Sequence, residues 1–392
     1  MSPILPTAHW RDRAGLDKLL NVLDAEAGAT RFVGGAVRDT LHGLDVHDID
    51  LATRLLPHDV LSRLKAAGIK AVPTGLAHGT ITAVLPDGPV EITTLRRDLS
   101  TDGRRATIAY TDDWQVDAAR RDFTINALSA DPLTGEVFDY FGGLADIAAG
   151  RVVFIGDPLT RIAEDHLRIM RFFRFLARFG RGEADTAALA ACTARANDLM
   201  ALSRERITDE LLKILKLPDP TPTVALMIRH GILKPVLPET VTAEALRALV
   251  QAEHTNNAPP SALRRLAALL PNDAATAENI GARLKLSKAQ RKGLVVLVER
   301  SAADADSPRA LAYWVGLENA HDRLLLGGYS TEPLANWTPP KFPLTGGNLI
   351  ARGLTAGPEV ATTLKAIETA WVTAGFPHGA ELETIVVVAL RR

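Results

Sequence analysis

The sequence predicts an α+β protein, in which a small head with a mixed β-sheet is followed by an all-helical remainder. Over about the first 155 residues, β-rich runs and helical patterns alternate; after Asp157-Pro158, helical periodicity dominates and strand signals nearly vanish. The composition is that of a folded globular chain, with 47% apolar and 23% charged residues among 392. This composition excludes a chain that is disordered as a whole.

The head is expected to contain two strands, two helices and a β-hairpin. Apolar periodicity and turn residues predict a strand at 31–33, a helix at 36–42, a strand at 48–53, an amphipathic helix at 57–67, and a hairpin of 80–85 with 90–95. Gly68 would end the amphipathic helix, and Pro86-Asp87-Gly88-Pro89 would form the hairpin turn.

One segment of the helical part has two distinct faces. Its apolar face consists of Ile162, Ile169, Phe172, Phe173, Leu176 and Phe179, and its basic face consists of Arg168, Arg171, Arg174 and Arg178. Further along the chain, breaks between helices are predicted at 218–220, 256–260 and 331–343.

Global features narrow the possible functions. The net charge is -1, so any surface that binds nucleic acid must be local. Cys192 is the only cysteine of the sequence, which excludes a disulfide framework and favours a reducing compartment. No stretch of eighteen uncharged apolar residues occurs, and the N-terminus lacks a basic segment before an apolar core. We therefore expect a cytoplasmic protein that contacts no membrane.

A glycine pair marks the first candidate site. Gly34-Gly35 follow the first predicted strand and precede a helix that carries Arg38. Glycines let backbone N–H groups approach a phosphate closely, and Arg38 would add charge-assisted hydrogen bonds. Taken alone, such a pair is commonly just a turn.

Two aspartates follow on the second predicted strand. Because side chains i and i+2 of a strand project to the same side, Asp48 and Asp50 would present paired carboxylates. Such a pair is repulsive unless a cation lies between, and Mg²⁺ prefers one or two carboxylates together with substrate phosphates. The alternative is a solvated strand edge. Glu91, on the neighbouring predicted strand, would either complete a three-carboxylate metal cluster or be an exposed strand residue.

These residues carry a resemblance. Gly34-Gly35-x-x-Arg38-Asp39 with Asp48-x-Asp50 resembles the head of the nucleotidyltransferase superfamily, and most of all the family of class II tRNA nucleotidyltransferases (CCA-adding enzymes) and bacterial poly(A) polymerases. The resemblance covers residues 30–215 and, with lower specificity, 340–375. It implies metal-dependent nucleotidyl transfer, with Asp48 and Asp50 binding two Mg²⁺ ions.

A second motif, Arg120 to Leu128, matches the family's RRDFTxNAL pattern without a gap. Adjacent arginines suit a triphosphate, and Asp122 and Asn126, four residues apart on an expected helix, would share one face. The resemblance assigns Arg121, Asp122 and Asn126 to triphosphate and ribose binding. The polar segment 95–119 is expected to be a mobile loop, at the position of the family's loop that is needed to switch from adding C to adding A.

A third motif, Asp157 to Arg168, matches the family's nucleobase-template helix. Cytosine and adenine both present an amino donor beside a ring-nitrogen acceptor, whereas guanine and uracil present a carbonyl acceptor beside an N–H donor. Asp165 can only accept and Arg168 can only donate, so the pair, spaced i,i+3 on one helical face, would select C and A. Glu164 would hold the Arg168 guanidinium in position.

Two further features are expected around the template helix. Arg171 would continue its face toward the base or phosphate, and six arginines between Arg161 and Arg181 suit phosphate contacts. The segment Glu205-Arg206-Ile207-x-x-Glu210-Leu211 matches a family element that braces the template helix.

The resemblance also implies an organisation and partners. A catalytic head at 1–155 would be followed by a helical neck at 156–240 with the template helix, and by a body and tail at 241–392 that bind tRNA. The tail resemblance rests on Leu344 to Ile350 with Gly353 and Gly357-Pro358. The expected substrates are tRNA, CTP and ATP, and no protein partner is inferred.

Other functions remain open at the level of sequence. A poly(A) polymerase shares the head motifs but usually carries a basic C-terminal extension, whereas this sequence ends Ala389-Leu390-Arg391-Arg392, which favours tRNA. A partial enzyme that adds only CC or only A fits the same motifs. A non-catalytic RNA-binding module would not need the aspartate pair.

Overall fold

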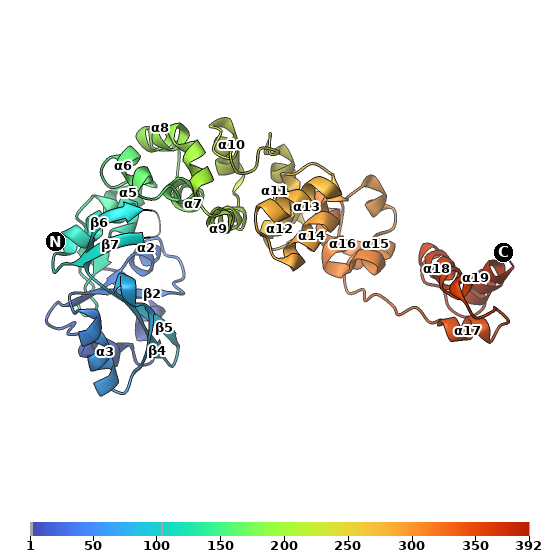
Figure 1. Ribbon diagram of the computed structural model, residues 1–392, viewed down its shortest axis with the longest axis horizontal. Coiled ribbons are helices and arrows are strands. Elements are labelled where there is room, and N and C mark those ends of the chain that lie inside the picture. Colours follow the sequence, from blue (N-terminus) through green and yellow to red (C-terminus); the bar gives the residue numbers. More distant parts are fainter. Residues whose placement is uncertain (1–2, 103–104, 392) are drawn as a thin grey trace. The chain divides into compact units, whose positions relative to one another are not determined.

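The protein is described by a computed structural model that covers residues 3–102 and 105–391. The chain divides into two compact units, coloured along the sequence in Figure 1. The first unit comprises Met1–Leu211 and Arg229–Val236, and the second comprises Leu212–Ile228 and Leu237–Arg392. The division into head, neck, and body with tail stays a prediction about how these units work.

A mixed seven-stranded sheet is the framework of the first unit, in the order β3-β4-β5-β2-β1-β8-β9. β2 and β5 are parallel, and the other neighbouring strands described are antiparallel. The strands are β1 (Thr30–Val33), β2 (Ile49–Thr53), β3 (Lys70–Gly75), β4 (Thr80–Leu85), β5 (Gly88–Thr94), β8 (Ser129–Ala130) and β9 (Val137–Phe138). The predicted mixed sheet is therefore confirmed, including the hairpin of β4 and β5.

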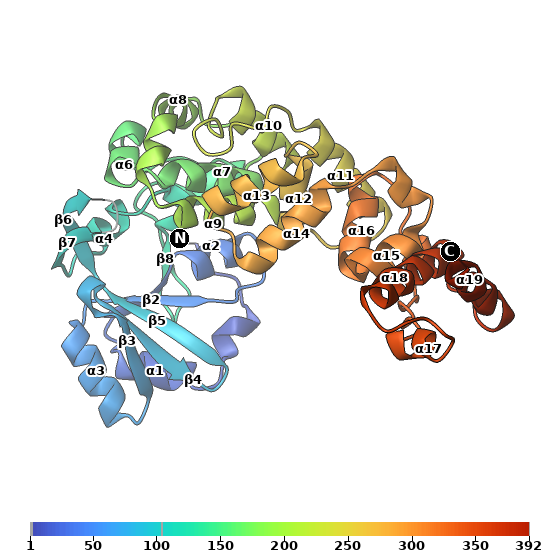
Figure 2. The ribbon, with the colours of Figure 1, turned by 45° about the vertical axis from the view of Figure 1, so that its right-hand side comes forward.

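The two faces of the sheet have different environments. Helices α1 (Leu16–Val22) and α3 (Pro57–Ala66) pack together, and α3 contacts β3 and β4 on one face (Figure 2). The strand residues that alternate toward the apolar side are at most 1% exposed: Ile49, Leu51, Ile81, Val90 and Ile92. Asp50 and Glu91, one position along, project from the other face, so strand alternation by itself puts the carboxylates outside the core.

Three short helices complete the head around this second face. They are α2 (Gly35–Leu41), α4 (Trp114–Ala119) and α5 (Gly143–Ala149). Asp113 caps α4, because its carboxylate accepts hydrogen bonds from the backbone N–H groups of Gln115 and Val116. The predicted helix after Gly34-Gly35 is confirmed as α2.

The segment 95–119, expected to be a mobile loop, contains regular secondary structure over most of its described residues. Strands β6 (Arg96–Asp102) and β7 (Arg105–Tyr110) form a separate two-stranded sheet, and α4 follows. The threonine and isoleucine residues of these strands have a high propensity for extended backbone. Gly103 and Arg104, which the expectation included, lie outside the described residues.

The predicted single template helix is wrong. Helix α6 (Pro158–Glu164) ends where Asp165 becomes extended, and helix α7 (Arg168–Phe179) begins three residues later. Asp157 caps α6, with its carboxylate accepting from the Thr160 N–H at 2.8 Å. The break arises because the Asp165 carboxylate accepts the Leu167 N–H at 3.1 Å, which competes with helix continuation.

The apolar face of α7 that the sequence predicted is largely buried, and it packs against Phe154 and Phe123 of the head. Phe172, Phe173 and Ile169 have no exposed surface, and the ring centroids of Phe172 and Phe154 lie 5.8 Å apart. Burial of each such side chain contributes about 1.5–3 kcal/mol, which ties the helix to the residues before α6. Helices α8 (Thr186–Ala194) and α9 (Arg204–Leu215) follow.

The rest of the chain is helical, as expected. Its helices are α10 (Thr221–Arg229), α11 (Glu244–Thr255), α12 (Ala262–Ala268), α13 (Ala274–Arg283), α14 (Lys288–Val298), α15 (Pro308–Val315), α16 (Leu317–Leu326), α17 (Gly346–Ile350), α18 (Pro358–Thr373) and α19 (Ala380–Leu390). The three predicted breaks fall between helices, the last of them interrupted by a short 3-10 turn at Glu332–Leu334. Within the described ranges, no helix has the length and apolar character needed to cross a bilayer.

Candidate active site

The turn between β1 and α2 places backbone beside two functional side chains. Gly34 has φ 63° and ψ -122°, a conformation that glycine adopts without strain. A Cβ at Gly34 would lie 3.0 Å from Arg121 Nη1 and 4.0 Å from Asp50 Oδ2. The absence of a side chain at Gly34 therefore lets Arg121 and Asp50 approach the same stretch of backbone.

The environment of Asp50 raises its pKa. It stands on β2, opposite Glu91 on the parallel strand β5, and Asp48 precedes the strand. Burial raises the pKa of Asp50 to about 6, Glu91 and Asp48 contribute in the same direction, and Arg121 opposes them. Asp48 and Glu91 are exposed. Burial and the neighbouring carboxylates disfavour the ionised form of Asp50, and a bound cation would stabilise that form.

The residues present fit a metal that shares its coordination with substrate. In the described part of the chain, no three His, Cys, Asp or Glu side chains are grouped closely enough to hold a metal ion alone. Asp48, which precedes β2, and Asp50 on β2 would supply two carboxylates to an ion completed by phosphate oxygens and water, and this pairing stays a prediction. Glu91 lies beside Asp50 in register, and its role as a third ligand stays a prediction.

A buried polar network joins the second motif to α2 and α7. Arg38 Nη1 donates to Asn126 Oδ1 at 2.5 Å, and Asn126 Nδ2 donates to Asp122 Oδ1 at 2.8 Å. Arg171 Nε and Nη2 each donate to Asp122 Oδ2 at 2.6 Å. Asp122 and Asn126 are not on an α-helix as expected, because Asn126 ends a short 3-10 helix (Thr124–Asn126). They nevertheless face each other as predicted.

The charge of Asp122 is fixed by this network. Burial by itself would raise the pKa of Asp122, but the Arg171 guanidinium and the hydrogen bond from Asn126 outweigh it and hold that pKa below its usual value. Asp122 is thus an anion with both oxygens engaged. It fixes the positions of Arg171 and Asn126 at the wall of the site.

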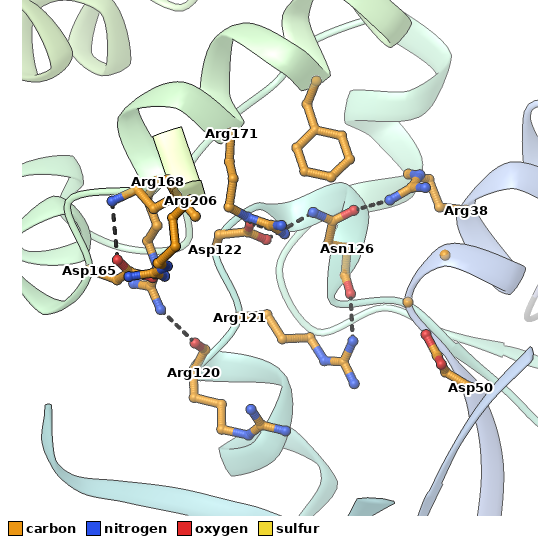
Figure 3. Close-up of a pocket in the computed structure, with 14 residues that line it drawn as sticks. Arg38, Asp50, Arg120, Arg121, Asp122, Asn126, Asp165, Arg168, Arg171 and Arg206 are labelled. Atoms are coloured by element: carbon orange, nitrogen blue, oxygen red, sulfur yellow. Dashed lines mark hydrogen bonds and ion pairs between the residues drawn. The ribbon is translucent and has the colours of Figure 1, made fainter. Parts of the chain in front are cut away.

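Arg121 lies at the centre of the site (Figure 3). Its Nη1 donates to the Asn126 carbonyl at 3.2 Å, and its Nη2 lies 3.6 Å from an Asp117 carboxylate oxygen. These long contacts leave the guanidinium available to an anionic ligand beside Gly34.

The nucleobase-template residues lie at the junction of α6 and α7. Arg168 Nη1 donates to Glu164 Oε2 at 2.5 Å, which is the pairing that the sequence predicted. Arg168 also donates to the carbonyls of Arg161 and Arg120, at 3.0 and 3.1 Å. Three of its five N–H groups are used in these contacts.

Asp165 has a different partner from the one its motif suggests. Its Oδ2 accepts from Arg206 Nη2 of α9 at 2.7 Å. Nearby, Arg174 Nε of α7 donates to Glu210 Oε2 at 2.6 Å. Two contacts thus run from α9 to the template region, in line with the expected bracing by the Glu205–Leu211 element. Sequence reasoning singled out this element but did not place Arg206 in the site.

One cavity of about 410 Å³ unites the three motifs (Figure 3). Its walls are Gly34, Gly35, Arg38, Asp50, Arg120, Arg121, Asp122, Asn126, Asp165, Leu167, Arg168, Arg171, Phe175 and Arg206. Of the predicted site residues, Asp48, Glu91 and Glu164 do not line it. Leu167, Phe175 and Arg206 were not predicted as site residues, and Arg120 was named only as part of the second motif. Six arginines and three aspartates make this cavity suitable for a polyanion that also offers hydrogen-bonding edges.

Family comparisons agree with this class of site. Residues 30–153 match the Poly A polymerase head domain, and residues 184–244 match the probable RNA and SrmB-binding site of polymerase A. The fold and cavity thus define a nucleotidyltransferase with a polymerase-type head.

Relatives of known name define the family more closely. The chain is 34% identical over 376 residues to the mitochondrial CCA tRNA nucleotidyltransferase 1 of Danio rerio, over 91% of this chain and 86% of the relative. It is 33% identical to the human protein of that name, over 92% and 87% of the two chains. The chain belongs to the CCA-adding tRNA nucleotidyltransferase family, whose members are metal-dependent enzymes.

Solved structures show the same architecture. The Bacillus stearothermophilus CCA-adding enzyme in complex with CTP superposes with a TM-score of 0.72 and 26% identity, over 91% of this chain and 93% of that one. The Thermotoga maritima CCA-adding enzyme complexed with tRNA has a TM-score of 0.70 at 21% identity, over 96% and 95%, which supports the fold.

Proposed function

We propose that this protein adds C, C and A to the 3′ end of tRNA from CTP and ATP, releasing pyrophosphate and using no nucleic-acid template. The cavity carries this proposal, because it unites Asp50 and the Gly34-Gly35 turn with Asp165 and Arg168. The relatives named above act as CCA tRNA nucleotidyltransferases, and a structural neighbour binds CTP. Asp48 and Asp50 act in catalysis, and the tRNA binds to the helical part at 241–392.

The triphosphate binds beside the glycine turn. Arg121 is the cation within reach of Gly34, and Arg38 and Asn126 fix the wall next to it. Asp122 and Asn126 face the ribose, and the ionised Asp122 accepts from a hydroxyl group once its present contacts rearrange. This assignment places the α-phosphate next to Asp50.

Base selection follows from the hydrogen-bonding groups of Asp165 and Arg168 that the protein itself does not use. Two N–H groups of Arg168 remain after its three contacts, and a carboxylate such as Asp165 has lone pairs beyond those that accept from Arg206 and Leu167. An acceptor beside a donor matches the edges of cytosine and adenine. Glu164 keeps the Arg168 guanidinium in place, and Arg171 stands at the phosphate side.

The metal is Mg²⁺, with two ions held by Asp48 and Asp50 and with Glu91 as a further ligand. When bound, these ions would activate the RNA 3′-hydroxyl group and stabilise the leaving pyrophosphate. A carboxylate with a raised pKa, Asp50, becomes fully ionised once a cation offsets Glu91 and Asp48.

The cytoplasm is the proposed location. The single buried cysteine suits a reducing compartment, whereas the vertebrate relatives carry the word mitochondrial in their names.

The test uses purified protein, Mg²⁺ and a tRNA transcript that ends before CCA. With CTP alone the product should gain two residues, with ATP alone essentially none, and with both it should gain three and stop. A long A ladder would instead indicate a poly(A) polymerase. A stop after CC in the presence of both nucleotides, or A added only to a transcript ending in CC, would indicate a partial enzyme.

A further inference from the structure

The face of the sheet beyond Asp50 is lined with polar side chains that the site described above does not use. Asp50 on β2 stands opposite Glu91 on β5, Glu91 stands opposite Thr82 on β4, and Thr82 stands opposite Val72 on β3. Directly paired residues project to the same side, so these side chains form one row on one face. Because neighbouring strands lie about 4.8 Å apart, Thr82 is about 10 Å from Asp50 along this row.

Threonine hydroxyls pair on this face. Thr74 Oγ1 and Thr82 Oγ1 are 2.8 Å apart, and Thr80 Oγ1 and Thr93 Oγ1 are 3.1 Å apart. Each pair has two hydroxyl hydrogens, and the bond between its members uses one. One O–H donor and several lone pairs per couple therefore remain for a ligand.

This part of the face is open, in contrast to the part over β1. Glu91, Thr74 and Val72 are exposed, with 40% of the surface of Val72 accessible, Thr80 and Thr93 are partly exposed, and Thr82, beside Thr74, is 9% exposed. On the other side of Asp50, Trp114 of α4 packs with Val33 and Ala52. The sheet thus has a covered half, next to the nucleotide cavity, and an open half formed by β5, β4 and β3.

The geometry of in-line transfer indicates that the nucleophile approaches over the open half of the sheet. The triphosphate cradle, Gly34 with Arg121, follows β1, and the strand order puts β1 and β5 on opposite sides of β2. The leaving pyrophosphate stays with the cradle, and an in-line nucleophile must approach the α-phosphate from the opposite side. That direction leads from Asp50 over Glu91 toward the threonine pairs.

We propose that the open face over β5, β4 and β3 binds the last two nucleotides of the RNA acceptor strand, with the Thr74–Thr82 and Thr80–Thr93 hydroxyl pairs bonding to ribose hydroxyls. The proposal rests on the proposed function, which requires an RNA 3′-hydroxyl at Asp50. The length of the row suits two nucleotides, and Val72 offers apolar surface at its far end. Lys70, exposed two residues before Val72 on β3, supplies a positive charge for a phosphate. Hydroxyl recognition distinguishes RNA from DNA at this position.

The test combines protein and primer changes. Thr74→Val with Thr82→Val keeps side-chain shape and strand propensity, and replacing both partners of a hydrogen bond is close to neutral for folding. We expect KM for tRNA to rise about three- to tenfold, the effect of losing one neutral hydrogen bond, while KM for CTP and kcat stay within about twofold. Thr80→Val with Thr93→Val should behave likewise.

A modified RNA primer provides the second part of the test. A transcript with 2′-deoxyribose in its last two nucleotides should lower wild-type kcat/KM about three- to tenfold. It should lower that of each double variant by a smaller factor, because each variant already lacks one of the two contacts that the deoxy primer removes. Thr134→Val, in the exposed turn between β8 and β9, is the matched control and should keep the full sensitivity to the deoxy primer.

The outcomes separate the two proposals. Failure of the wild-type protein to extend any tRNA would overturn the proposed function and, with it, this subsite. Normal CCA addition combined with an unchanged KM for tRNA in both double variants would overturn the subsite alone. Equal deoxy sensitivity of wild-type and variant proteins would also overturn it, because the hydroxyls would then be read elsewhere.

Discussion

At the scale of single residues, neighbours determine what each charged group can do. Asp122 and Asp50 are carboxylates on the same wall, yet Arg171 and Asn126 hold the pKa of Asp122 below its usual value, whereas burial, together with Glu91, raises that of Asp50 to about 6. The first is a fixed anion that orients its neighbours. The second is a group that prefers to share its site with a cation.

The pKa of Asp50 gives a stability prediction. Folded protein keeps this proton up to about pH 6 and unfolded protein releases it near pH 3.8, so the folded state binds more protons in between and loses stability as pH rises through that window. In the absence of divalent cations, Asp50→Asn should therefore raise the free energy of unfolding at pH 8 by about 1–3 kcal/mol. The gain should shrink toward pH 4 in urea titrations.

Two further observations check this prediction. Mg²⁺ with CTP should stabilise the wild-type protein more than Asp50→Asn, and the variant should lose nucleotide addition while it retains tRNA binding. A variant that is less stable than wild type at pH 8 would contradict the assigned charge state.

Arg168 gives a specificity prediction. Arg168→Ala should lower kcat/KM for CTP and ATP about tenfold or more, and that for UTP and GTP much less, because a donor to the ring nitrogen is lost. Arg161→Ala is a matched control, because Arg161 also pairs with Glu164 but does not line the cavity. Competition between pairs of nucleotides measures the ratio, and an unchanged ratio in Arg168→Ala would exclude its role in base selection.

At the scale of elements, short connections place the chemistry. The turn from β1 to α2 brings Gly34 beside Arg121, and the break between α6 and α7 lets Asp165 and Arg168 face one cavity although they do not share a helix. At Gly34 the absence of a side chain permits the backbone conformation, and at Asp165 the side chain ends the helix.

Two glycines with positive φ test the role of the turn from β1 to α2. Gly34→Ala and Gly43→Ala both place a Cβ at a positive φ, 63° and 68°, and each should cost about 1–3 kcal/mol of stability. Only the Cβ at Gly34 meets Arg121, whereas nothing lies within 4 Å of the one at Gly43. Gly34→Ala should raise KM for CTP at least tenfold and Gly43→Ala should leave it unchanged, as steady-state kinetics at 25 °C would show. Equal KM values would contradict the cradle.

Many of these elements could be predicted from the sequence. The strand at 31–33, the helix after Gly35 and the strand with Asp50 carry strong periodicity, and the gapless motifs identified most of the cavity. β3 escaped prediction because it is an exposed edge strand that contains Pro73. The helix break at Asp165 escaped because it depends on contacts with Leu167 and with Arg206, which is 41 residues away.

At the scale of the whole molecule, the second unit has its own polar core. Arg265, 1% exposed, donates to Glu253 at 2.8 Å, to the carbonyls of Leu215 and Pro218 at 2.8 and 2.9 Å, and to that of Leu217. One buried guanidinium thus holds the end of α9 and the loop after it to α11 and α12. Periodicity cannot reveal such a group, because a basic residue in an amphipathic helix reads as solvent-exposed.

Removal of this group should act on the second unit. Arg265→Ala leaves Glu253 Oε2 and three carbonyls without the donor that Arg265 supplies, while Glu253 Oε1 keeps Arg264, and we expect a loss of about 3–5 kcal/mol. Differential scanning calorimetry should show a lower transition for the second unit only. Arg352→Ala breaks an exposed pair with Glu383 and should change stability by less than about 1 kcal/mol. Equal effects of the two variants would contradict the structural role of Arg265.

The central claim is that the protein itself chooses C and A through one cavity. The most direct measurement offers each of the four nucleoside triphosphates, singly and then together, to wild-type protein with a tRNA transcript lacking CCA, and determines the sequence of the products. We predict that only C is added first, that A follows only after two C residues, and that the mixture yields CCA and then stops. Efficient addition of U or G, or continued extension past the third residue, would contradict the account.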